Sequence, residues 1–161
     1  MKLAEETTEA IKHDILDKAF LRFGRFGFGK TTMAEIAKDC DMSAGNLYRY
    51  FDNKKEIAAG CAQRCMQQKL ELVREILRDS NLSPDKKLQR FALDILEYMH
   101  QQFSDQPALM ELVDFVSRER WDIVTHYMEQ EKSLLSEILS EGNRSGQYNV
   151  SNVLETAKWI Q

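Results

Sequence analysis

Residues 31–51 read TTMAEIAKDCDMSAGNLYRYF. Thr32 followed by Glu35 fits a capping box, in which each side chain bonds the other residue's backbone amide, so we expect a helix to begin there. A second helix is expected to span Ser43 to Tyr50, since Ser43 is a favoured cap residue. The chain must turn sharply at Asp41, a residue type that tolerates left-handed backbone angles. The stretch therefore predicts a helix-turn-helix, whose second helix has the size and shape to enter the major groove of DNA.

Many positions between Thr31 and Lys54 also follow a known family pattern. They are Thr31, Thr32, Ile36, Ala37, Ser43, Gly45, Leu47, Tyr48, Tyr50, Phe51 and Lys54. In these positions the sequence resembles the helix-turn-helix of the tetracycline-repressor (TetR) family of bacterial transcriptional regulators, and the resemblance covers about residues 8–60. The sequence departs from the family pattern at Cys40, where Ala is usual, and at Asp41, where Gly is usual.

The resemblance implies an all-α fold. It predicts a three-helix head that binds DNA, residues 1–52, joined by a long helix to a helical effector-binding and dimerisation body, residues 53–161. Hydrophobic periodicity and cap residues predict the helices, which we place at about 8–25 (ended by Gly24 and Gly27), 53–77, 84–103, from Pro107, 119–141 (broken by Gly142 to Gly146) and from 151. The last of these stops at Gln161 without an ending signal, so we expect the body to be truncated relative to the family.

The second helix of the motif carries the residues expected to meet DNA. Asn46 is the best candidate for reading a base edge, since its amide both donates and accepts, while Gly45 permits close approach and Ala44 suits a thymine methyl group. The resemblance assigns phosphate contacts to Thr32, Tyr48, Tyr50 and Lys54. Ser43 caps the helix, and Arg49 suits either role. The family further implies a homodimer on a near-palindromic operator.

Charge and composition agree with this interpretation. Residues 11–55 hold nine Lys or Arg and six Asp or Glu, a balance of +3, and since the whole chain carries −4, the remaining residues carry −7. The basic charge thus lies in the segment expected to face the phosphates. Three cysteines without framework spacing and the lack of an apolar leader favour the cytoplasm, with reduced thiols.

A cluster of large, adaptable side chains in the body suggests an apolar pocket for a small hydrophobic or aromatic effector, an expectation that depends mainly on the family resemblance. The candidates are Phe91, Ile95, Tyr98, Met99, Phe103, Phe115, Trp121 and Tyr127. The resemblance predicts a repressor that such an effector releases from DNA. The alternative is the same head regulated by a protein partner.

Two weaker motifs point to other chemistry. Residues 24–31, GRFGFGKT, match the spacing of a phosphate-binding loop, but that loop needs a preceding strand, and the preceding residues have helical periodicity. Cys61 and Cys65 lie one helical turn apart, a spacing that suits a metal or an oxidant sensor but is commoner for structural cysteines. No catalytic constellation stands out, so we expect no enzymatic activity, cofactor or metal.

Overall fold

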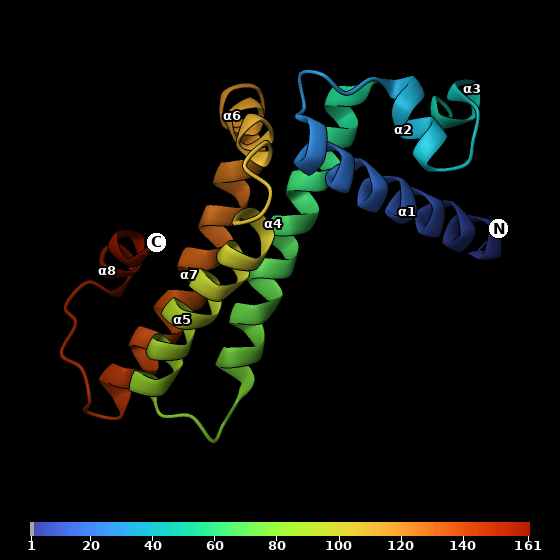
Figure 1. Ribbon diagram of the computed structural model, residues 1–161. Helices are drawn as coiled ribbons and strands as arrows, with labels where there is room; N and C mark the ends of the chain where they lie inside the picture. Colours follow the sequence, from blue (N-terminus) through green and yellow to red (C-terminus); the bar gives the residue numbers. More distant parts are fainter. Residues whose placement is uncertain (1) are drawn as a thin grey trace. The chain divides into compact units, whose positions relative to one another are not determined.

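The computed structural model describes residues 2–161, with side chains from residue 7 onward, and confirms the all-α class. No strand occurs among these residues, and none of their helices is long and apolar enough to span a membrane. The helices labelled in Figure 1 are α1 (Lys2–Phe26), α2 (Met33–Asp39), α3 (Ala44–Leu47), α4 (Lys54–Arg78), α5 (Pro84–Phe103), α6 (Leu109–Glu119), α7 (Trp121–Arg144) and α8 (Val153–Ile160).

Side-chain caps start four of these helices, at or next to the predicted starts. Thr32 precedes α2 and forms the full capping box with Glu35. Ser43 precedes α3, Asn53 precedes α4 and Ser83 precedes α5, and each side-chain oxygen accepts from the backbone N–H three residues later, at 3.2, 3.1 and 3.5 Å respectively. These bonds satisfy amides that the first helical turn leaves without a partner.

Two of the glycines predicted to end helices lie inside helices instead. Gly27, with φ of 87°, does end α1, because this left-handed angle costs glycine little. Gly24, however, lies inside α1, where a Cβ would come within 1.7 Å of the Gln106 side chain. Gly142 likewise lies inside α7, which continues to Arg144 and leaves room there for the Tyr148 ring. Both glycines serve close packing instead of ending a helix.

The chain forms two compact units. The first contains the residues up to Arg64 together with Asp105–Trp121, and the second contains Cys65–Ser104 and Asp122–Gln161. Thus α6 groups with the helix-turn-helix, and the division falls within α4. The predicted domain boundary lies between residues 52 and 53 and groups α6 with the body, which differs from this division into compact units.

Each unit has its own apolar core. In the first unit Ile15, Ala19 and Phe23, spaced by four along α1, are fully buried, as are Ile36 of α2 and Leu47 of α3. The second unit buries a cluster drawn from four helices: Val73, Phe91, Leu135, Leu139 and Ala157. The short helices α2 and α3 are marginal alone and are held by packing, since α2 contacts α1 and α3 contacts α2.

Candidate nucleic-acid interface

The turn between α2 and α3 has the predicted geometry. Asp41 adopts φ of 53°, the left-handed angle expected there. Cys40 is buried, and burial raises the pKa of its thiol to about 11, so the thiol stays neutral inside the turn. Leu47 is fully buried and anchors α3, which packs against α2 (Figure 1). One side of α3 is thereby fixed, and the other side remains available to a ligand.

The second helix of the motif is shorter than predicted. We expected a helix from Ser43 to Tyr50, but α3 spans only Ala44–Leu47. After Leu47 the backbone hydrogen bonds span three residues instead of four. The Arg49 N–H donates to the Asn46 carbonyl at 3.1 Å, and the Tyr50 N–H donates to the Leu47 carbonyl at 3.0 Å. Such i to i−3 bonds are typical of a narrower turn at a helix end.

Of the predicted base-reading residues, Gly45 and Arg49 are exposed, whereas Ala44 and Asn46 are half-buried. A Cβ at Gly45 would meet no atom within 4 Å, so the backbone there is open to close approach. Ser43, Tyr48 and Arg49 are exposed, with 51% of Tyr48 accessible, and Asn46 is half-buried beside them. Hydroxyl, amide and guanidinium groups around an open backbone match the donors and acceptors that DNA binding uses.

Two residues assigned to phosphates have partners inside the first unit. The Thr32 hydroxyl accepts from the Glu35 N–H at 3.3 Å and contacts the Glu35 carboxylate at 2.8 Å. The Lys54 ammonium donates to the carbonyl oxygens of Phe28, Gly29 and Thr31 at 2.6, 3.2 and 2.7 Å. Burial lowers the pKa of Lys54, an effect that the nearby Glu111 carboxylate opposes. Their phosphate roles remain predictions from the family pattern.

An ion pair that sequence reasoning missed braces α1 against α2. Arg22 donates to both carboxylate oxygens of Asp39, with Nη2 to Oδ1 at 2.9 Å, and its Nη1 lies 3.6 Å from Glu35. Hydrogen bonding to Arg22 lowers the pKa of Asp39, and hydrogen bonding to Thr32 lowers that of Glu35. The residues are 17 positions apart, too far for a helical spacing to reveal the pair.

The helix α6 contacts the start of the helix-turn-helix through three residues spaced by four. Glu111 accepts from the Gly29 N–H at 2.8 Å, and the Phe115 ring stacks on Phe28 with centroids 4.6 Å apart. Glu119 lies 3.5 Å from Lys55. Four-residue spacing places all three on one face of the helix, so α6 joins the loop before α2 and the first turn of α4.

The predicted pocket residues differ in burial, and they belong to both compact units. Phe91 belongs to the core of the second unit, whereas Phe115 belongs to the first unit. Met99 is 42% exposed and Trp121 is 55% exposed. Burial raises the pKa of Tyr127, and the Tyr98 hydroxyl donates to the Cys65 carbonyl at 3.0 Å. Ile95 packs against the core of the second unit and Phe103 is half-buried. The effector site therefore stays a prediction.

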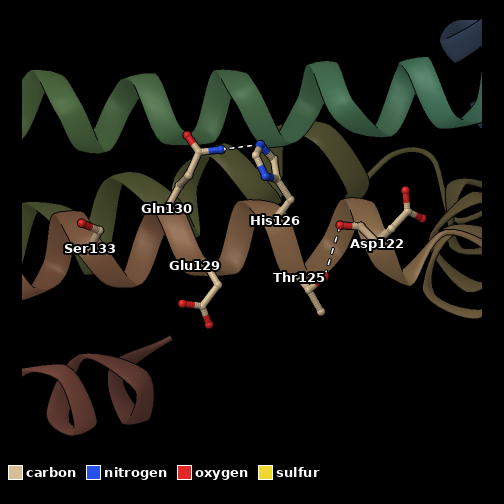
Figure 2. Close-up of a pocket in the computed structure, with 6 residues that line it drawn as sticks. All are labelled: Asp122, Thr125, His126, Glu129, Gln130 and Ser133. Atoms are coloured by element: carbon tan, nitrogen blue, oxygen red, sulfur yellow. Dashed lines mark hydrogen bonds between the residues drawn. The ribbon is translucent and has the colours of Figure 1, made fainter.

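One surface depression of the second unit lies along α7 (Figure 2). It is lined by Asp122, Thr125, His126, Glu129, Gln130 and Ser133. His126 and Gln130 point to the same side, and their side-chain nitrogens lie 2.8 Å apart (Figure 2). None of the predicted pocket residues lines this depression, and its lining residues are polar.

The structure also resolves the two weaker motifs. The glycine-rich residues 24–31 follow helix α1 instead of a strand, and the Gly29 amide is bonded to Glu111, so the arrangement of a phosphate-binding loop is absent from this described segment. Cys61 is buried, with its thiol 3.5 Å from the Leu16 carbonyl, which is a structural setting.

Comparison with known families supports the architecture. A family model described as "Bacterial regulatory proteins, tetR family" matches residues 15–61, and one described as "Tetracyclin repressor-like, C-terminal domain" matches residues 84–161. The chain belongs to the TetR family. The predicted family is confirmed, and the protein is a TetR-family transcriptional regulator.

Curated relatives are longer than the segment they share with this TetR-family chain. It is 26% identical over 149 residues to YttP of Bacillus subtilis, named a probable HTH-type transcriptional regulator, and the match covers 85% of the chain and 67% of YttP. It is 31% identical over 103 residues to IcaR of Staphylococcus aureus, the negative transcriptional regulator of the biofilm operon icaADBC. That match covers 60% of the chain and only 55% of IcaR.

Solved structures share the fold at low identity. A transcriptional regulator from Cytophaga hutchinsonii has a TM-score of 0.75 at 22% identity, covering 91% of this chain and 74% of that one. The fatty acid degradation regulator FadR from Bacillus halodurans has a TM-score of 0.73 at 18% identity, with coverages of 92% and 77%. SmeT, in its complex with triclosan, has a TM-score of 0.66 at 16% identity, with coverages of 92% and 74%.

Proposed function

We propose that this TetR-family chain is a repressor that binds a near-palindromic operator as a homodimer, with each α3 in a major groove. The observation that carries the proposal is the exposed part of α3 and the turn after it, where the backbone at Gly45 is open and Tyr48 and Arg49 are exposed. Two copies related by a two-fold axis would place their α3 helices about 34 Å apart on one face of the duplex.

The residues of α3 and of the turn that follows it divide into two roles. Asn46 reads a base edge through its amide, Gly45 lets the backbone approach, and Ala44 contacts a thymine methyl group. Tyr48 and Tyr50 bind phosphates through their hydroxyls and set the register of the protein on the duplex. The basic balance of residues 11–55 attracts the duplex as a whole.

Release by a small hydrophobic or aromatic effector is the second part of the proposal. Its support comes from relatives: IcaR is named a negative regulator, and SmeT was solved with triclosan. Helix α6 supplies the connection, because it contacts the head through Glu111, Phe115 and Glu119 and is joined along the chain to α5 and α7. An effector that shifts α6 would bias the head between two geometries.

Selection from a pool of random duplexes at low salt tests the DNA-binding proposal. The purified chain should enrich inverted repeats, and binding to them should weaken steeply as salt rises. Failure to enrich any sequence, or enrichment of sites without a repeat, would contradict it.

A second titration tests the effector class. Triclosan and a panel of other hydrophobic aromatic compounds are added to the complex between the chain and the selected operator. We expect at least one compound to lower operator affinity while leaving the helical circular dichroism intact. Unchanged affinity across the panel would contradict a small aromatic effector and favour control by a protein partner.

A further inference from the structure

Helix α2 is attached to α1 by few apolar side chains. The buried residues of α2 are Ile36 and Ala37, and α2 contacts α1. Burial of apolar surface is favourable but has no preferred direction, so two side chains hold α2 against α1 without fixing its rotation. Fixing the orientation of α2 requires a contact that has a geometry of its own.

The Arg22 guanidinium of α1 supplies such a contact. It donates to both carboxylate oxygens of Asp39, the last residue of α2, and its Nη1 lies 3.6 Å from Glu35 in the first turn. The Arg22 side chain is 14% exposed, and the Phe26 ring lies against the guanidinium, with its centroid 5.0 Å from Cζ. A fork of two hydrogen bonds fixes an angle as well as a distance.

The turn after α2 carries this orientation to α3. The Asp41 N–H donates to the Lys38 carbonyl at 3.1 Å, and the Met42 N–H donates to the Ala37 carbonyl at 3.0 Å. The turn is thus hydrogen-bonded to the last turn of α2, and α3 follows directly and packs on α2. Whatever fixes the end of α2 on α1 therefore also fixes the direction of α3.

We propose that Arg22 is a positioning residue for operator recognition: by holding Asp39 and Glu35, it sets the orientation of α3 and so decides how well the chain tells its operator from other sequences. Side chains read base edges only within hydrogen-bond distance, whereas attraction to phosphates depends mainly on charge. A rotated α3 therefore loses affinity for the operator and keeps its affinity for random DNA. The inference rests on the proposed function, in which α3 enters the major groove.

Substitution of Arg22 by Lys tests the inference. Lys keeps the positive charge but replaces the planar fork by a single ammonium group. We expect affinity for the selected operator to fall about tenfold, the scale of one hydrogen bond to a charged group, and affinity for random duplex to stay within about twofold. A smaller folded fraction would lower both affinities by one factor, so their ratio reports the orientation of α3 and not stability. An unchanged ratio would overturn the proposal.

Arg64→Lys is the matched control. The Arg64 Nη2 lies 2.6 Å from Asp17 and its Nη1 donates to the His13 carbonyl, so this side chain joins α4 to α1 through the same chemistry. We expect its ratio of affinities to match the wild type. Asp39→Asn keeps one oxygen that accepts from Arg22, so its ratio should fall less than that of Arg22→Lys. Equal falls in Arg64→Lys and Arg22→Lys would overturn the role assigned to Arg22.

Residual dipolar couplings of the backbone amides, measured by NMR without DNA, report the orientation directly. We expect the couplings of α2 and α3 to change relative to those of α1 in Arg22→Lys and to keep their wild-type values in Arg64→Lys. Unchanged couplings in Arg22→Lys would also overturn the proposal. A wild-type chain that binds operator and random duplex alike would instead refute only the proposed function.

Discussion

Asn46 lies beside the open backbone of Gly45, and its amide is the group of α3 best suited to a base edge. We therefore predict that Asn46→Ala relaxes preference at one base pair per half-site, with a loss of about 1–3 kcal/mol of discrimination. Tyr48→Phe should instead weaken binding to all sequences alike. Competition assays with single-base operator variants measure both effects, and a uniform loss in Asn46→Ala would contradict the assigned role.

The carboxylate of Asp39 makes the stability of the head sensitive to acid. Arg22 lowers the pKa of Asp39 in the folded state, so the folded state binds fewer protons than the unfolded state at acidic pH. The stabilisation is present above the unfolded pKa of about 3.9 and is lost as the pH falls through the folded value. We expect the melting temperature of the chain to fall below about pH 4.

Asp39→Asn is the matched variant for the acid prediction. It removes the titrating group but keeps an oxygen that accepts from Arg22. Its melting temperature should be lower than the wild-type value at neutral pH and should depend less on pH below 4, the region about the unfolded pKa of Asp. Parallel pH profiles for the variant and the wild type would show that another group carries the acid sensitivity.

Among the helices, α1 contains a glycine, Gly24, at a position where the Gln106 side chain fills the space that a Cβ would need. Gly24→Ala should destabilise the chain, although Ala is favoured over Gly inside a helix by about 1 kcal/mol. In a Gln106→Ala background the carboxamide is gone and only the Cβ of residue 106 remains, 3.3 Å from the added methyl group. The same change should then stabilise the chain, by up to about 1 kcal/mol. Urea unfolding of the four proteins of this cycle measures the reversal, and the same sign in both backgrounds would contradict the packing explanation.

The helix starts were predictable because their signals are local. Thr32, Ser43, Asn53 and Ser83 each act through an amide three residues away, within reach of a sequence pattern. The place of α6 was not predictable, since the bond from Gly29 to Glu111 joins residues 82 positions apart. Gly24 was misassigned as a helix end for the same reason, because its neighbour Gln106 comes from a distant segment.

The candidate site shows the same division between local and distant signals. The exposed part of the motif follows from the short sequence itself, in which Leu47 is buried while Tyr48 and Arg49 are exposed. The pocket prediction grouped apolar side chains by type, and composition does not tell which unit buries them. Phe115 accordingly stacks on Phe28 in the first unit, while Phe91 lies in the core of the second.

For the molecule as a whole, the uneven charge and the proposed two-fold axis predict how DNA geometry controls affinity. Two α3 helices reading one face need half-sites about one helical turn apart. Inserting about five base pairs, half a turn, between the half-sites should reduce binding to that of a single half-site and lower the salt slope. Gel-shift titrations on operators with graded spacers measure this, and an affinity independent of spacing would contradict the dimer geometry.

The central claim is that α3 occupies the major groove, and methylation protection of the selected operator tests it most directly. Dimethyl sulfate modifies guanine N7 in the major groove and adenine N3 in the minor groove. The wild type should protect guanine N7 in two patches about one turn apart and leave adenine N3 reactive. Gly45→Trp, a change into open space, should keep the fold but lose both patches. Protection confined to adenine N3, or guanine protection that survives in Gly45→Trp, would contradict the account.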